Sequence, residues 1–213
     1  MVPDLPWNGC SGIKVKAFYL PIGSLRCLVV LLLILSASRV WGDYEAGLQA
    51  AQNGDFETAF REFSVAAEEG LMIAQFNLAI LYFSGRGIEQ DYQQAFRWTK
   101  AAADQGHTQA QFNLGALYYE GQGTRRDREL ALQFYILAGN ADYVPAQYNI
   151  GEMYYLGDGV DKDLVRAHAW LSRAVENQHE TAAGLLEEIE SDMSEGQLSE
   201  ARRMFARLKI GLE

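Results

Sequence analysis

Cysteine, proline and basic residues are scarce in this 213-residue chain, which has two cysteines and four prolines. Both cysteines, Cys10 and Cys27, lie near the N-terminus, so the rest of the sequence holds neither a disulfide framework nor a paired CxxC zinc motif. Acidic residues outnumber basic ones 28 to 18, for a formal net charge of −10. This balance argues against general nucleic-acid binding, which depends on Lys and Arg to neutralise phosphates. We predict no metal site, no cofactor and no nucleic-acid partner.

The first 42 residues differ in composition from the rest of the chain. A basic stretch precedes an apolar run at residues 27–35, and small residues follow it up to Asp43. This order is typical of a secretory signal peptide, so we predict that residues 1–42 are a leader cleaved before Asp43, with Ser38 as the second choice of site. The run is shorter than the roughly 20 residues that a membrane-spanning helix needs. An uncleaved membrane anchor formed by residues 27–38 is the alternative.

One segment recurs through the remaining sequence at intervals of 36 residues. Residues 74–78 read AQFNL, residues 110–114 repeat AQFNL, and residues 146–150 read AQYNI. A glycine pair and an aspartate recur in the same register, and Asp55 continues the register upstream. Self-similarity at a fixed period of this length is the signature of a repeat array. The predicted divisions are an N-terminal partial repeat at 43–73, three repeats at 74–109, 110–145 and 146–181, and C-terminal capping helices at 182–213.

Each unit has the apolar spacing and end signals of two helices. The pattern predicts a first helix over residues 108–120, ended by Gly121, and a second helix that begins at the N-cap Asp127. Ser194 and Gln197 predict a capping box at the start of a polar last helix. One hairpin cannot cover its own apolar face, so successive hairpins must stack. The predicted fold class is all-α: an α/α superhelical solenoid of stacked helical hairpins with a C-terminal capping helix.

The unit at residues 110–145 carries the pattern A-Q-F-N-L-G-x-L-Y-Y-x-G-x-G followed by D-x-x-x-A. This pattern resembles a Sel-one-like repeat (SLR), a branch of the tetratricopeptide-repeat superfamily, and the resemblance covers roughly residues 55–190. It implies that the first helices line a concave surface, and that the protein is a scaffold or adaptor, often periplasmic or membrane-associated in bacteria. We therefore expect an exported, non-enzymatic protein, in the bacterial periplasm or secreted, whose partner is a peptide or helix segment of another protein.

The candidate binding surface is three equivalent stripes on the first helices of successive repeats. Asparagine heads each stripe, and its amide can both donate to and accept from a peptide backbone. The same asparagines can instead tie neighbouring repeats together, and their strict recurrence fits either role. The other members of the stripes vary, so we expect them to set specificity. The nine residues are Asn77, Ile80 and Ser84; Asn113, Ala116 and Glu120; and Asn149, Glu152 and Leu156.

Catalytic interpretations have less support in the sequence. His107 and His179 are two repeats apart and cannot share a metal ion, and His168 has Ser172, not a carboxylate, four residues further on. We expect three surface or lightly packed histidines and no catalytic residue. Two alternatives to the adaptor function stay open: an envelope hydrolase-like enzyme, which has been proposed for some SLR relatives, and a purely structural accessory subunit of an envelope complex.

Overall fold

The computed structural model describes residues 39–211, which contain helices and turns and no strand. Residues 1–38 of the predicted leader lie outside this part of the chain. From Val40 onward the chain forms one compact unit. Within residues 39–211, no helix combines the length and hydropathy needed to cross a bilayer.

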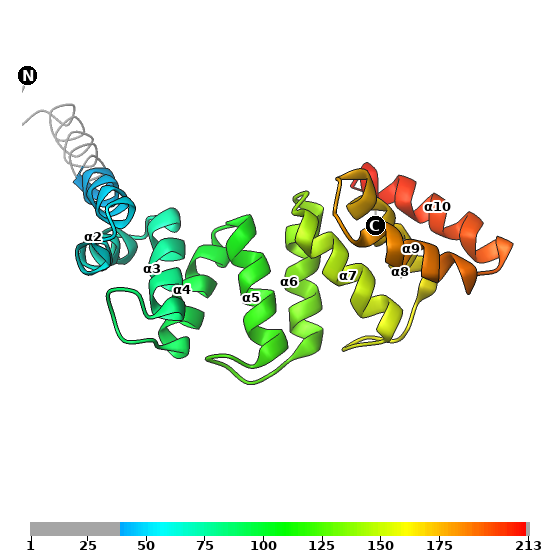
Figure 1. Ribbon diagram of the computed structural model, residues 1–213, viewed down its shortest axis with the longest axis horizontal. Coiled ribbons are helices and arrows are strands. Elements are labelled where there is room, and N and C mark those ends of the chain that lie inside the picture. Colours follow the sequence, from blue (N-terminus) through cyan, green and yellow to red (C-terminus); the bar gives the residue numbers. More distant parts are fainter. Residues whose placement is uncertain (1–38, 212–213) are drawn as a thin grey trace, which may run out of the picture. The chain divides into compact units, whose positions relative to one another are not determined.

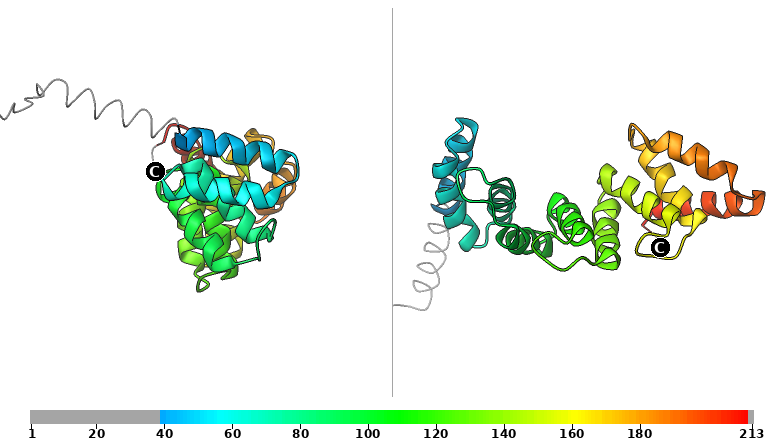
Figure 2. Two further views of the ribbon diagram at one scale, coloured as in Figure 1. Left: turned by 90° about the vertical axis from the view of Figure 1, so that its left-hand side faces the viewer. Right: turned by 60° about the horizontal axis from the view of Figure 1, so that its bottom comes forward.

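Consecutive helices pair into hairpins that follow one another in a row (Figures 1 and 2). We call the first helix of each pair the A helix and the second the B helix. Each helix from α2 onward packs against the next as far as α9, and α10 returns onto α8. The predicted solenoid of stacked hairpins is confirmed. The pairs are helical residues 39–52 with α2 (Phe56–Glu68), α3 (Met72–Ser84) with α4 (Tyr92–Asp104), α5 (Thr108–Glu120) with α6 (Arg128–Asn140), and α7 (Val144–Leu156) with α8 (Leu164–Glu176), followed by α9 (Ala182–Ser191) and α10 (Glu195–Lys209).

The recurring polar residues of each unit begin and end its helices. An aspartate caps every B helix from α2 to α8; in α6, for example, Asp127 Oδ1 accepts from the Leu130 N–H at 3.0 Å. A left-handed glycine ends each of α3, α5 and α7, as Gly121 does at φ 73°. Because these signals stop and restart the helix at the same points in each unit, α3 to α8 all have 13 residues. The capping box of Ser194 and Gln197 is also confirmed.

The second glycine of each glycine pair lies against the B helix of the preceding hairpin. A Cβ atom built on Gly123 would lie 1.8 Å from the carbonyl oxygen of Tyr92, the first residue of α4. Gly87 approaches Phe56 and Gly159 approaches Arg128 in the same way. A side chain at these positions would separate the loop from the preceding helix. The G-x-G pairs are therefore contacts between repeats as well as turns.

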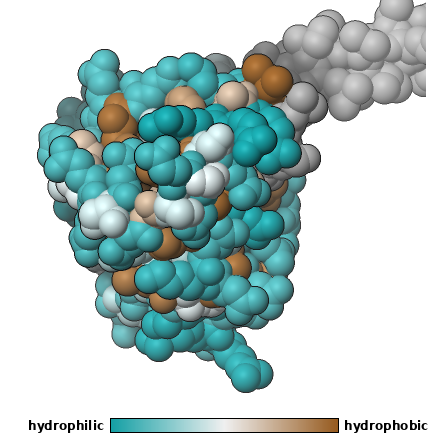
Figure 3. All heavy atoms as spheres, turned by 90° about the vertical axis from the view of Figure 1, so that its right-hand side faces the viewer, coloured by the Kyte–Doolittle hydropathy of each residue, from teal (hydrophilic) through white to brown (hydrophobic). Residues whose placement is uncertain are grey.

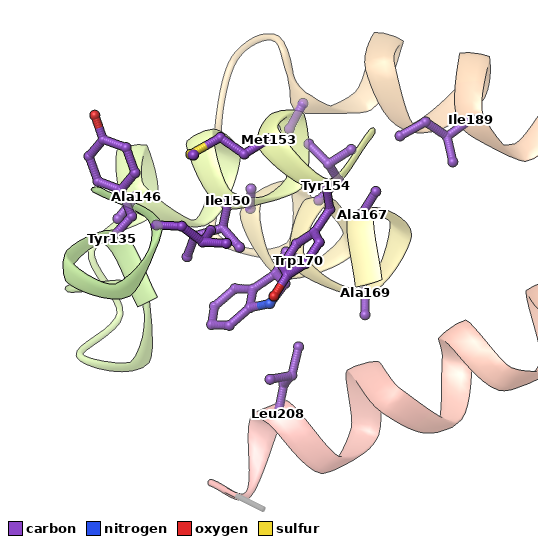
Figure 4. Packing of buried hydrophobic residues seen from close by; sticks show 14 of the residues in the cluster. Tyr135, Ala146, Ile150, Met153, Tyr154, Ala167, Ala169, Trp170, Ile189 and Leu208 are labelled. Atoms are coloured by element: carbon purple, nitrogen blue, oxygen red, sulfur yellow. The ribbon is translucent and has the colours of Figure 1, made fainter. Parts of the chain in front are cut away.

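The core is continuous through the last two full repeats and the C-terminal helices. Trp170 on α8 is 2% exposed and packs with Ile150 of α7 and Leu208 of α10 (Figure 4). The opposite side of α10 carries charged residues, and the face at that end of the protein is mostly hydrophilic (Figure 3). Helix α10 thus covers the apolar surface of the last complete repeat, as a capping helix does.

A complete A helix at residues 39–52 precedes α2, so it begins four residues before the predicted partial repeat, within the predicted leader. Its Gly47 lies against Phe63 of α2, as Gly115 of α5 lies against Tyr135 of α6. Only residues 53–55 connect this A helix to α2, whereas residues 85–91 connect α3 to α4. The shorter connection shifts this helix out of the 36-residue register, so the sequence pattern shows only the B half of the unit.

Replacing Gly123 by alanine should destabilise the protein by more than about 3 kcal/mol, because the methyl group meets a backbone carbonyl and the left-handed φ of 71° is strained for alanine. The matched control is Gly106→Ala, where φ is 90° and nothing lies within 4 Å of the added carbon. This control should lose only about 1–2 kcal/mol. The free energy of unfolding measured in urea tests both. Equal losses would contradict the proposed backbone contact.

Candidate functional site

Two neighbouring pockets open between the A helices of successive repeats. The first has a volume of about 200 Å³ and lies between α3 and α5, with Thr99 of α4 behind them. Ile80 and Phe83 are more than 40% exposed at this pocket although both are large and apolar. We call it the apolar pocket; its lining residues are Ala79, Ile80, Phe83, Ser84, Thr99, Asn113, Ala116, Leu117, Glu120 and Gln122.

The second pocket is the 36-residue translate of the first. It has a volume of about 190 Å³ and lies between α5 and α7, and each of its lining residues follows a residue of the apolar pocket by 36 positions. The equivalent side chains differ in charge, because Glu120 replaces Ser84, Glu152 replaces Ala116 and Asp158 replaces Gln122, while Leu156 replaces Glu120. The second pocket therefore has three carboxylates and the first has one. We call it the acidic pocket; it is lined by Tyr119, Glu120, Tyr135, Asn149, Glu152, Met153, Leu156 and Asp158.

Eight of the nine predicted site residues line these two pockets, and Glu120 belongs to both. The exception, Asn77, contacts the Tyr44 hydroxyl of the preceding hairpin at 3.5 Å. Asn149 likewise faces the Tyr135 hydroxyl of the preceding hairpin, and burial raises the pKa of Tyr135 to about 12. These contacts show that Asn77 and Asn149 join neighbouring hairpins. Their amides are therefore partly occupied by the fold, and the variable residues differ most between the pockets.

The three carboxylates of the acidic pocket are not equivalent. Asp158 forms an ion pair with Arg128 and accepts a hydrogen bond from the Tyr119 hydroxyl at 2.6 Å, which raises the pKa of that tyrosine. Glu152 accepts a hydrogen bond from the Tyr148 hydroxyl, at 3.3 Å. Among the described residues, neither Glu152 nor Glu120 has a cationic partner within 4.0 Å. Two uncompensated negative charges therefore remain at this pocket.

The glutamine of the recurrent AQ(F/Y)N segment holds the A helices in place behind the pockets. Gln147 of α7 is fully buried and donates to the Gly139 carbonyl near the end of α6 at 3.1 Å. Gln75 of α3 makes the equivalent bond to Ala67 of α2 at 3.2 Å. A buried amide must be hydrogen-bonded to be tolerated. These side chains thus fix α3 and α7 to the preceding B helices.

Two histidines stack on aromatic side chains at the turns between hairpins. The His107 ring lies 4.3 Å from the Phe76 ring, and the His179 ring lies 4.5 Å from the Tyr148 ring. His107 is also the N-cap of α5, since its Nδ1 accepts from the Ala110 N–H at 3.1 Å. Burial lowers the pKa of His107. Both rings serve packing between repeats, and neither lines the two pockets.

His168 differs from our expectation of a surface or lightly packed side chain, because it is only 4% exposed. Its Nε2 lies 2.9 Å from Glu190 of α9 and its Nδ1 lies 3.2 Å from the Ser172 hydroxyl. This contact was not predictable from the repeat pattern, since Glu190 lies on α9, beyond the last full repeat. The order of carboxylate, imidazole and hydroxyl resembles a hydrolase triad.

The surroundings of Ser172 favour a structural role for this cluster. Ser172 lies inside α8, where backbone N–H groups are engaged in helical hydrogen bonds and cannot form an oxyanion hole. The bond between His168 and Glu190 instead joins α8 to α9. Within residues 39–211, no three His, Cys, Asp or Glu side chains are grouped so that they can hold a metal ion.

Stacked A/B hairpins with a 36-residue period define a helical-repeat solenoid of the tetratricopeptide-like class. The chain belongs to the Sel1 repeat family, whose repeat matches residues 73–107, 108–143 and 144–179. Sel1 repeat proteins are generally scaffolds for protein interactions, and their fold is typically non-catalytic.

Two solved structures are similar to this chain. A Sel1 repeat protein from Oxalobacter formigenes is 30% identical, with a TM-score of 0.67 over 76% of this chain and 68% of that one. The protein c5321, a protective antigen present in uropathogenic Escherichia coli strains that displays an SLR fold, is 24% identical, with a TM-score of 0.55 over 84% of this chain and 47% of its own. The second likeness shows the fold alone. A search of curated proteins found no match.

The cap and the lowered pKa of His107 predict a pH dependence of stability. The unfolded chain binds a proton at about the ordinary value of 6.5, while the folded protein binds it only at lower pH. Stability should therefore fall as the pH drops below 6.5, until the pH reaches the lowered value. His107→Asn keeps a capping acceptor that does not titrate, so its free energy of unfolding should fall less between pH 7 and pH 5. At pH 8, the difference in the free energy of unfolding between the unchanged protein and His107→Asn measures the loss of the stacking on Phe76. Parallel pH profiles would contradict the assignment.

Proposed function

We propose that this protein is an exported, non-enzymatic adaptor that binds a segment of another protein in the groove formed by the apolar and acidic pockets. The observation that carries the proposal is the pair of equivalent pockets on adjacent A helices. Each pocket is smaller than the ~300–1,000 Å³ of a typical small-molecule site. A pocket of this size suits one side chain, and two equivalent pockets one repeat apart suit two side chains of a single chain segment.

The side chains of the groove support recognition rather than a reaction. The exposed apolar surface of Ile80 and Phe83 gains free energy when it is covered. The amide of Asn113 offers a donor and an acceptor to an extended backbone. Neither pocket is lined by a histidine or cysteine, and the buried His168 cluster lies at other residues of the chain. An adaptor function uses all of these groups without requiring a nucleophile.

A photoreactive amino acid at Leu156 should capture one specific partner protein in the native cell. Leu156 is 62% exposed and lines the acidic pocket. The matched control is the same amino acid at Leu137, which is 51% exposed on the B helix α6 and lines neither pocket. Mass spectrometry should find a partner adduct from position 156 only. The same adducts from both positions, or none from position 156, would count against the groove as the binding site.

The export part of the proposal depends on the basic and apolar pattern of residues 1–42. The proposed cut before Asp43 falls within the helical residues 39–52. It leaves Tyr44 in the mature chain, where this side chain is 6% exposed and packs in one buried cluster with Phe63 of α2. N-terminal sequencing of the protein from the envelope or medium should read Asp-Tyr-Glu-Ala. A protein that retains residues 27–38 is membrane-anchored by the alternative route, and that result would contradict cleavage.

A further inference from the structure

The two pockets of the groove offer different chemistry to one partner segment. The A helices repeat the same geometry, so the difference comes entirely from side chains at equivalent positions. This contrast says more about the partner than the existence of a groove does. If the groove binds a partner segment, as proposed above, its two pockets constrain the side chains of that segment.

Apart from Glu120, which it shares with the acidic pocket, the wall of the apolar pocket carries no charge. The hydroxyl of Ser84 is already bonded to the Ile80 carbonyl at 2.8 Å. Leu117 forms a buried part of the wall, and the rings and methyl groups of Phe83 and Ile80 stand exposed beside it. An apolar side chain seated here would remove this surface from water, which is the main source of affinity at the centre of an interface.

The acidic pocket has two negative charges that the fold leaves uncompensated. Arg128 already neutralises Asp158, so the charge available to a guest comes from Glu120 and Glu152. Glu152 is partly buried, which makes its charge harder for water to screen. The neutral hydroxyl of Tyr135 and the amide of Asn149 add uncharged polar groups. A cationic side chain is the guest that complements this set.

We infer that the partner segment presents an apolar side chain to the apolar pocket and a lysine or arginine side chain to the acidic pocket. Glu120 lies on the boundary between the two pockets and so faces both guests. The order of the pockets along α3, α5 and α7 sets the order of the two side chains along the segment. A segment with an acidic residue at the second position is repelled, which gives selectivity as well as affinity.

Selection of random linear peptides on the full-length protein tests the inference. Enriched peptides should share an apolar residue and a basic residue at a fixed separation. Binding of a synthesised enriched peptide, measured by fluorescence polarisation, should weaken by about tenfold or more in the variant Glu120→Lys plus Glu152→Lys, since the attraction of one exposed and one partly buried carboxylate is replaced by repulsion. A second selection on this variant should enrich acidic residues in place of basic ones.

The control variant is Glu129→Lys plus Glu180→Lys, which makes the same change in net charge at exposed residues outside both pockets. It should bind the peptide as the unchanged protein does, and equal weakening by both variants would overturn the inference.

The variant Ala116→Arg, which fills the apolar pocket, distinguishes failure of the proposed groove from failure of the inference about the partner. Peptides that still bind Ala116→Arg contradict the groove itself. Peptides that lose binding to Ala116→Arg but show no preference for a basic residue contradict only the inference about the partner.

Discussion

The close approach of each loop glycine to the preceding B helix is the contact on which the regular stacking depends. Gly87 and Gly123 lie against backbone atoms at the start of α2 and α4, and Gly159 lies against the backbone and the Cβ of Arg128, the first residue of α6. A contact between backbones is insensitive to the side chains around it, so it can recur unchanged in each unit. Each hairpin is therefore placed on the previous one in the same way, and residues 36 positions apart enter equivalent environments.

The recurrent AQ(F/Y)N segment combines the structural and surface roles of the A helix within four residues. Ala146 is fully buried, and Gln147 is bonded to the preceding hairpin. Tyr148 stacks on His179 of the next turn, and Asn149 reaches the pocket. Each residue points in a different direction because a helix turns by about 100° per residue. The segment recurs because Gln147, Tyr148 and Asn149 each contact a residue outside their own helix that holds the hairpins in place. Specificity is therefore left to residues further along the helix.

The repeats and the capping box of the last helix were predictable from the sequence, because each has a local signal, whereas contacts between a repeat and an aperiodic helix were not. The bounds of α5 and the cap at Asp127 follow from local signals that repeat three times. The bond of His168 to Glu190 joins a repeat to α9, which lies outside the repeats, so no spacing in the sequence predicts it. The A helix at residues 39–52 was missed because its shorter connection displaces it from the register. The positions of the pockets were predictable from the 36-residue period, whereas the ion pair between Arg128 and Asp158 was not.

Translational symmetry also explains how a small array can be selective. Identical backbones would give identical pockets, so selectivity requires variation at positions that the stacking does not use. Position 116 and its equivalent 152 meet this condition, because an alanine and a glutamate occupy the same place in the two pockets without altering the helices that carry them. The asparagines at 77 and 149 do not meet it, because their amides contact tyrosines of the preceding hairpin. A residue that both stacks the repeats and faces the groove is constrained by the first role, so the chemistry that distinguishes partners must lie in its variable neighbours.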